Sequence, residues 1–142
     1  MLVSEILRIK GSTTLFTTTP ERSVLEAVEV MAQHDIGSLV VMDHGKLAGM
    51  LTFAEVLRAL AERRGQLGDA AVADIYEREP LMAVPGLDVM ELRGAMLERH
   101  ARYVPVMDGS TLQGVVSFHD VAKAVLEEQS FENRMLKSYI KD

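Results

Sequence analysis

Near its end the chain reads GVVSFHDV from Gly114 to Val121, and sixty-five residues earlier it reads GMLTFAEV from Gly49 to Val56. Both stretches run glycine, two apolar residues, a hydroxyl residue, phenylalanine, one further residue, a carboxylate and valine. The same shift carries the segment 20–62 onto the later part of the chain without a gap, and it aligns Pro20 with Pro85. This agreement of prolines, glycines, carboxylates and apolar residues indicates an internal repeat.

Each copy has the hydrophobic pattern of a strand, a helix, two strands and a second helix. In the first copy, Ser23 is a suitable N-cap for a helix with apolar residues at helical spacing, and His44-Gly45 is a turn signal between two apolar runs. We expect strands at 15–19, 38–43, 47–51, 81–84, 103–107 and 112–116, and helices starting at Ser23, Thr52, Asp88 and Ser117. The predicted fold is α+β, with two β-α-β-β-α repeats packed with pseudo-two-fold symmetry.

The repeat divides the chain into four segments. Residues 1–64 form the first copy, 65–71 a glycine-containing linker, 72–126 the second copy, and 127–142 a tail without a counterpart in the first copy. The similar stretches VSEIL, from Val3, and VADIY, from Val72, give each copy a short leader.

The tail carries an apolar stripe at helical spacing, formed by Phe131, Met135, Tyr139 and Ile140. We therefore expect the last helix to continue as an extended C-terminal helix. The stripe either docks on its own chain or contacts another subunit, and the sequence leaves both alternatives open.

Composition narrows the classes of protein. The chain has 142 residues, 48% of them hydrophobic, which suits one ordinary domain or two small halves that share a core. It has no cysteine, which excludes disulfides, thiolate metal sites and a cysteine nucleophile. Its formal net charge of −6 argues against a sequence-independent nucleic-acid binder. Because no apolar run approaches the roughly 18 residues of a membrane span, and the start lacks a signal-peptide core, we expect no membrane partner and a cytoplasmic location.

The sequence offers no catalytic set. Ser117, His119 and Asp120 are the residue types of a hydrolase triad, but residues two apart on a helix point about 200° apart. The four histidines show no metal-ligand spacing, and the chain has neither a Walker loop nor a GxGxxG motif. We expect no enzymatic activity, no metal site and no catalytic cofactor.

The repeated stretch has two explanations at its helix start. In a capping box, the Thr52 or Ser117 hydroxyl accepts from the first amides while Glu55 or Asp120 reaches back, although Asp120 is shorter than the usual Glu or Gln. Alternatively, the unpaired amides bind phosphate, and the carboxylate one turn later accepts from ribose hydroxyls. On these residues alone, the capping box is the stronger interpretation.

The chain resembles tandem cystathionine-β-synthase (CBS) domains, the Bateman module, of the small stand-alone bacterial type. The resemblance covers almost the whole chain, including the tail segment FENRMLKSYI. It is carried by both copies, through the leader VSEIL, VLEAV at 24–28, DIGSLVVMD at 35–43, ARYVPVMD at 101–108 and GVVSFHDV at 114–121.

The resemblance implies an adenine-nucleotide ligand, AMP, ADP, ATP or NAD, in the cleft between the copies. It implies that Ser117 and Asp120 hold phosphate and ribose and that Arg102, three residues before Pro105, meets phosphate. The remaining residues that it implies around the adenine and at the edge of the cleft are Ile36, Gly37, Val115, Met50, Thr13 and Thr14.

The first copy departs from the family pattern. It has Glu55 where the family prefers Asp, and Gly37 where the second copy has Arg102. We therefore expect Thr52, Glu55 and Met50 to form a second, weaker site.

The resemblance further implies a regulatory module that senses energy or redox state for an unknown effector protein, and that forms a homodimer. The alternative is a protein-interaction or dimerisation module with vestigial ligand clefts, in which the tail helix makes the contact.

Overall fold

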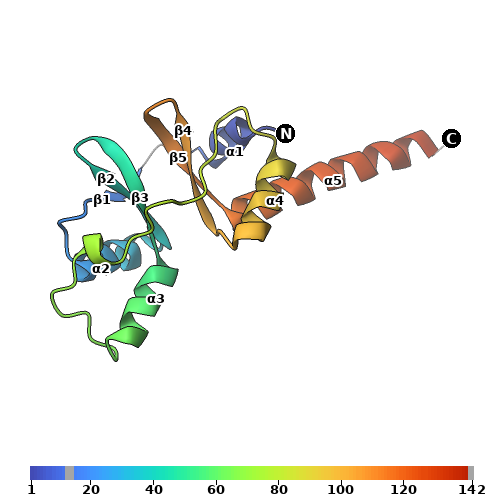
Figure 1. Ribbon diagram of the computed structural model, residues 1–142. Coiled ribbons are helices and arrows are strands. Elements are labelled where there is room, and N and C mark those ends of the chain that lie inside the picture. Colours follow the sequence, from blue (N-terminus) through green and yellow to red (C-terminus); the bar gives the residue numbers. More distant parts are fainter. Residues whose placement is uncertain (12–14, 141–142) are drawn as a thin grey trace. The chain divides into compact units, whose positions relative to one another are not determined.

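The computed structural model describes residues 1–11 and 15–140, and it divides into two compact units (Figure 1). The α3 unit contains β1 (Thr17–Thr18), α2 (Val24–His34), β2 (Ser38–Asp43), β3 (Lys46–Thr52), α3 (Phe53–Glu62) and the short 3₁₀ helix η1 (Val72–Asp74). The α5 unit contains α1 (Val3–Lys10), α4 (Val89–Arg99), β4 (Tyr103–Asp108), β5 (Thr111–Ser117) and α5 (Phe118–Ile140). The predicted α+β fold with an extended C-terminal helix is confirmed.

The α3 unit is built on a sheet with the order β1-β2-β3, in which β1 is parallel to β2 and β2 is antiparallel to β3. The β2–β3 hairpin turns through His44 and Gly45, whose φ angles are 51° and 76°. Two successive positive φ angles suit a type I′ turn, which follows the twist of the strands. The turn signal read from the sequence therefore marks this hairpin.

The first helix of each copy starts at the residue expected to cap it. The Glu26 amide donates to Ser23 Oγ over 3.0 Å, and the Met90 amide donates to Asp88 Oδ2 over 3.0 Å. Each bond satisfies an amide that has no partner inside its helix. Ser23 and Asp88 thus have the same capping role in the two copies.

The strand expected at residues 81–84 is wrong. Only Ala83 pairs, in a single parallel bridge with Val106, so the sheet of the α5 unit has the two strands β4 and β5. In the α3 unit the Val40 amide donates to the Phe16 carbonyl over 3.1 Å. The corresponding residue of β4 is Pro105, which has no N–H to donate, so the pairing stops after one residue.

Each leader packs into the unit formed by the other copy. Val3 and Ile6 of α1 are buried in the core of the α5 unit, and Val72 of η1 is buried in the core of the α3 unit. Equivalent main-chain bonds fix them, namely Val3 N to Leu87 O (2.9 Å), Ser4 N to Pro85 O (2.9 Å), Val72 N to Arg22 O (2.8 Å) and Ala73 N to Pro20 O (2.9 Å). The compact units therefore exchange the segments with which the copies begin.

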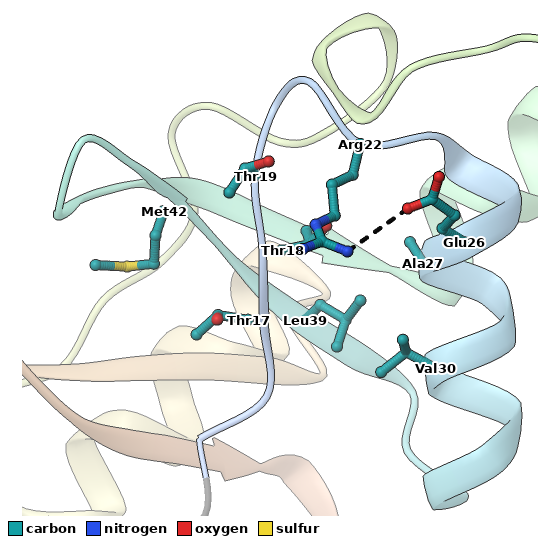
Figure 2. Close-up of a pocket in the computed structure, with 9 residues that line it drawn as sticks. All are labelled: Thr17, Thr18, Thr19, Arg22, Glu26, Ala27, Val30, Leu39 and Met42. Atoms are coloured by element: carbon teal, nitrogen blue, oxygen red, sulfur yellow. Dashed lines mark ion pairs between the residues drawn. The ribbon is translucent and has the colours of Figure 1, made fainter.

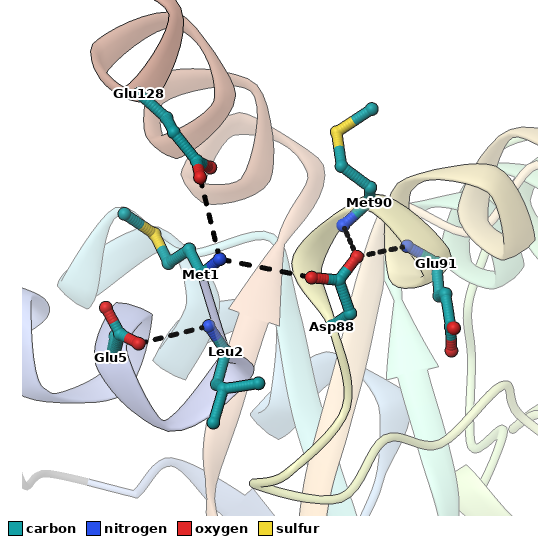
Figure 3. A network of polar contacts seen from close by, with 7 residues as sticks. All are labelled: Met1, Leu2, Glu5, Asp88, Met90, Glu91 and Glu128. Atoms are coloured by element: carbon teal, nitrogen blue, oxygen red, sulfur yellow. Dashed lines mark hydrogen bonds and ion pairs between the residues drawn. The ribbon is translucent and has the colours of Figure 1, made fainter. Parts of the chain in front are cut away.

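Further polar contacts hold the start of α1 in the α5 unit (Figure 3). The amino group of Met1 lies 3.9 Å from Asp88 Oδ1 and 3.6 Å from Glu128 Oε1, which belong to the N-cap of α4 and to α5. The Leu2 amide donates to Glu5 Oε1 over 3.3 Å. Since Asp88 also caps α4, one carboxylate links two helices of the unit.

The repeated glycine lies against a leader or the residues that follow it in both units. A Cβ at Gly49 would lie 1.9 Å from the Glu77 carbonyl oxygen, on the segment that follows η1. A Cβ at Gly114 would lie 3.0 Å from Leu7 Cδ2 of α1. At Gly49 a backbone carbonyl leaves no room for a side chain, whereas at Gly114 the neighbour is the end of the flexible Leu7 side chain.

Helix α5 continues without interruption to Ile140 and extends beyond the other elements of its unit (Figure 1). Along this extension Phe131, Met135, Leu136 and Tyr139 are 57%, 48%, 59% and 84% exposed. The described part of the tail therefore does not dock on the other elements of its own unit.

Candidate functional site

Ser117 and Asp120 form a reciprocal capping box where β5 ends and α5 begins. The Ser117 amide donates to Asp120 Oδ2 over 2.9 Å, and the Asp120 amide donates to Ser117 Oγ over 3.0 Å. The shorter side chain of Asp therefore reaches the cap, contrary to the expectation that it fits less well. The capping box is confirmed, and it places a hydroxyl and a carboxylate together at a helix N-terminus.

Lys10, the last residue of α1, reaches into this helix start. Its Nζ lies 2.8 Å from Asp120 Oδ2 and donates to the Val115 carbonyl oxygen over 3.0 Å. The Lys10 side chain is 37% exposed and that of Asp120 is 17% exposed. An ammonium group, a carboxylate and a helix N-terminus thus meet at a partly accessible point of the α5 unit.

These contacts set the charge of Asp120. Burial by itself raises the pKa of this carboxyl, but the hydrogen bond from Lys10, the amide of Ser117 and the lysine charge outweigh it and lower the pKa below its ordinary value of 3.8. Asp120 is therefore firmly ionised at neutral pH, as an acceptor for hydroxyl groups should be.

Sequence reasoning missed Lys10. The residue lies in a leader, 110 positions before Asp120, and the repeat alone assigns that leader to the first copy. The sequence offers one signal, a difference between the leaders. Lys10 follows the first leader, whereas Glu79 stands at the corresponding distance after the second leader.

Thr52 and Glu55 form the corresponding capping box at the start of α3, with a tighter geometry. The Thr52 amide donates to Glu55 Oε1 over 2.7 Å, and the Thr52 hydroxyl donates to Oε2 over 3.1 Å. Both oxygens of Glu55 are thereby engaged by one neighbour, and the residue is only 8% exposed.

The electrostatic setting of Glu55 is opposite to that of Asp120. Burial raises the pKa of Glu55 above its ordinary value of 4.5, and the charge of Glu77 adds to this, while the bonds from Thr52 and the charge of Arg58 offset it only in part. The start of α3 thus has an acidic neighbour where the start of α5 has a lysine.

Arg102 and Gly37 occupy equivalent positions before the middle strands. The Phe118 amide donates to the Arg102 carbonyl over 2.8 Å, and the Phe53 amide donates to the Gly37 carbonyl over 3.0 Å. The backbone of Arg102 is therefore joined to the first turn of α5, and its side chain is exposed. Arg102, Val115, Ser117 and Asp120 lie together in the α5 unit.

The other residues expected to line a site belong to the α3 unit or lie outside the described chain. Ile36 and Gly37 are half-buried in the α3 unit. Met50 is 1% exposed, and its amide and carbonyl both pair with Glu77. Thr13 and Thr14 lie outside the described residues.

Within residues 1–11 and 15–140, no group of three or more histidine, aspartate and glutamate side chains is placed to hold a metal ion. Among the described helices, none is both long enough and apolar enough to cross a bilayer.

Comparison with known protein families and curated proteins identifies CBS domains in this chain. The family model "CBS domain" matches residues 3–62 and 72–127. The mitochondrial CBS domain-containing protein CBSX3 of Arabidopsis thaliana is 31% identical over 147 residues, which is 97% of this chain and 71% of the relative.

Solved structures give the same result. A protein with CBS domains from Burkholderia ambifaria superposes with a TM-score of 0.84 at 28% identity, over 91% of this chain and 96% of its own. The CBS domain pair of protein MJ0100, in complex with 5-methylthioadenosine and S-adenosyl-L-methionine, superposes with a TM-score of 0.78 at 26% identity, over 90% of this chain and 98% of its own.

Proposed function

Because the chain belongs to the CBS-domain family and carries two CBS domains in tandem, we propose that it is a regulatory module that binds an adenine nucleotide at the start of α5. The proposed ligands are AMP, ADP, ATP or NAD, bound without chemical change. The bound ligand reports energy or redox state to a separate effector protein. The observation that carries the proposal is the arrangement of Lys10, Ser117 and Asp120.

The chemistry of this point suits a ribose next to a phosphate. Asp120 is ionised and only partly buried, and its bonds from Lys10 and the Ser117 amide both go to Oδ2, whereas Thr52 engages both oxygens of Glu55. Ribose hydroxyls donate well to such a carboxylate. The N-terminus of α5 and the Lys10 ammonium favour an anion beside it. Arg102, whose backbone joins the same turn, is proposed as a further phosphate contact.

The positive charge selects among adenosine-containing ligands. The neighbour MJ0100 is described with 5-methylthioadenosine and S-adenosyl-L-methionine, which share adenosine with AMP but carry no phosphate. A lysine 2.8 Å from Asp120 repels a sulfonium cation and attracts a phosphate. We therefore assign the phosphate-bearing members of the class to this chain.

The start of α3 is proposed as the weaker site. Glu55 is buried, has both oxygens engaged and has Glu77 as an acidic neighbour. A ribose would have to displace the bonds from Thr52, and a phosphate would meet negative charge. Thr52, Glu55 and Met50 are therefore expected to bind nucleotide more weakly than the α5 site or to stay empty.

A regulatory effect follows if the ligand changes the position of α1. A phosphate that draws Lys10 away from Asp120 alters a contact between α1 and α5, which belong to one unit. The ligand shifts the equilibrium between two arrangements only by its difference in affinity for them. The effector is proposed to recognise one of those arrangements.

The test is thermal unfolding of extensively dialysed protein with adenosine, AMP, ADP, ATP, NAD, 5-methylthioadenosine and S-adenosyl-L-methionine. A ligand at a hundredfold its dissociation constant adds about 2.7 kcal/mol of stability. We expect a shift of several degrees with at least one phosphate-bearing compound and smaller shifts with the others.

Matched variants locate the binding. Asp120→Asn should weaken binding of the nucleotide by about tenfold or more, because a charged acceptor is lost. Asp88→Asn makes the same change at another helix start of the same unit and should leave binding unaltered. A nucleotide that binds Asp120→Asn as tightly as the parent protein would place the site elsewhere.

The exposed tail of α5 supports a second proposed role, formation of a homodimer. Phe131, Met135 and Tyr139 recur every four residues on the extension of α5 and are exposed by 57%, 48% and 84%. An apolar stripe of this kind on a helix without a partner is typical of a helix–helix interface. Sedimentation of the chain ended after Ser130 tests this role: we expect monomers with unchanged nucleotide binding, and dimers of the shortened chain would contradict it.

A further inference from the structure

The two ends of α1 are held in different ways. Its first turns are fixed in the α5 unit, because Val3 and Ile6 are 0% and 3% exposed and the Val3 amide donates to the Leu87 carbonyl over 2.9 Å. In the last turn, Ile9 is 60% exposed, and its neighbour Lys10 is exposed as well. The last turn therefore depends on what the Lys10 side chain contacts.

Lys10 ties this last turn to the start of α5. Its Nζ donates to Asp120 Oδ2 over 2.8 Å and to the Val115 carbonyl oxygen over 3.0 Å. An ammonium group has three N–H donors, so these two bonds leave one donor beside the helix start. The lysine thus lies at the point proposed above for the nucleotide, with a donor to spare for an anion.

This contact joins two elements of one unit, unlike an ion pair within a single helix. Arg22 and Glu26 stand one turn apart in α2, beside a cavity of the α3 unit (Figure 2). They lie 3.6 Å apart and are 64% and 58% exposed, so they contribute little and hold no second element. The Asp120 side chain is 17% exposed, and Lys10 reaches it from another helix. A change of charge beside Asp120 therefore acts on α1.

We propose that the last turn of α1 reports the charge of the bound ligand. The inference rests on the proposed function, because it takes the start of α5 as the ligand site. A phosphate beside Asp120 gives the Lys10 ammonium a second anion and holds the turn more firmly. A sulfonium ligand at the same place repels the ammonium and loosens the turn. A neutral adenosine ligand changes the charge at this point least.

The held and the loosened turn offer a partner two states to distinguish. A partner protein that prefers the held turn binds the phosphate-loaded chain more tightly. By linkage, that partner raises the affinity of the chain for the phosphate-bearing ligand by the same factor. Ile9 gives such a partner an exposed apolar side chain on the turn itself.

The test is amide hydrogen exchange of the full chain, followed by NMR at saturating AMP, 5-methylthioadenosine or S-adenosyl-L-methionine. The three compounds share adenosine and differ in the charge attached to it. We expect AMP to slow exchange of the Ile9 and Lys10 amides about twofold to fivefold, the effect of a partly exposed ion pair. 5-Methylthioadenosine should change the rates less, and S-adenosyl-L-methionine should raise them.

Two variants of the same turn show whether the lysine is responsible. Lys10→Met removes the ammonium group and keeps the length of the side chain. Its Ile9 amide should exchange about twofold to fivefold faster without ligand and respond equally to all three compounds. Arg8→Met removes another exposed cation of this turn and should keep the responses of the parent protein.

The possible results separate this inference from the proposed function. If AMP shifts the amides of Val115, Ser117 and Asp120 while Ile9 exchanges at one rate with all three compounds, the inference is wrong and the nucleotide site stands. The inference is also wrong if Lys10→Met responds to the compounds as the parent does. If AMP shifts no amide at the start of α5, both the inference and the proposed function are wrong.

Discussion

At the scale of residues, the two copies use the same capping box with opposite electrostatics. Asp120 has a lysine beside it and a lowered pKa, whereas Glu55 is buried next to Glu77 and has a raised pKa. Asp120 therefore stabilises the folded chain at pH values above 3.8 and loses that contribution as the pH falls through its folded pKa. Glu55 does the reverse, because the native state holds its proton more tightly than the unfolded state.

Replacement of Glu55 by Gln should change the pH dependence of stability. Gln keeps the capping geometry and cannot ionise. In the parent protein, the contribution of Glu55 is fully present below its ordinary pKa of 4.5 and is lost as the pH rises through the higher folded pKa. Urea unfolding between about pH 4 and pH 7 should show Glu55→Gln gaining stability relative to the parent as pH rises. A difference that is constant with pH would refute the assignment.

Replacement of Lys10 by Met should raise the pKa of Asp120. The side chain keeps its length and loses the charge and the hydrogen bonds to Asp120 and Val115. Carboxyl ¹³C NMR titration measures this pKa directly, and Arg8→Met on the same helix is the control. The partly exposed ion pair should contribute only about 0.2–1 kcal/mol to stability. An unchanged pKa of Asp120 in Lys10→Met would contradict the contact.

At the scale of elements, the stability cost of replacing the repeated glycine depends on which atoms lie next to it in each unit. Gly49→Ala brings a Cβ against the Glu77 carbonyl, which is backbone and paired with Met50, so the strand must shift. We expect Gly49→Ala to cost about 1–3 kcal/mol, the usual range for overpacking. Gly114→Ala meets only the end of the Leu7 side chain and should cost less. Chemical unfolding of both variants measures this, and equal losses would contradict the packing of the leaders.

Most elements were predictable from the sequence because their signals are local. The caps Ser23 and Asp88 and the turn His44-Gly45 need only neighbouring residues. The strand at 81–84 failed because its pairing depends on Pro105, which lies on a different strand and lacks an N–H.

Only the residues of the candidate site that lie close together in the sequence were predictable. Ser117 and Asp120 lie three residues apart, and their capping box follows from the sequence motif. Lys10 was not predictable, because its place depends on the exchange of leaders between the units, and the repeat gives the order of the segments but not their partners.

At the scale of the whole molecule, the exposed tail of α5 ties stability to protein concentration. If Phe131, Met135 and Tyr139 form a subunit interface, the thermal midpoint of the full chain should rise with concentration. The chain ended after Ser130 should have a midpoint that does not depend on concentration. A full chain whose midpoint is also independent of concentration would contradict the proposed dimer.

The central claim, that the start of α5 holds an adenine nucleotide, is tested most directly by an amide NMR titration of the full chain with AMP. The account predicts that the largest shifts fall on Val115, Ser117, Phe118 and Asp120, together with the end of α1 at Lys10. It also predicts that these shifts disappear in Asp120→Asn and remain in Asp88→Asn. Saturable shifts confined to other parts of the chain, or no shifts at all from nucleotide-free protein, would contradict it.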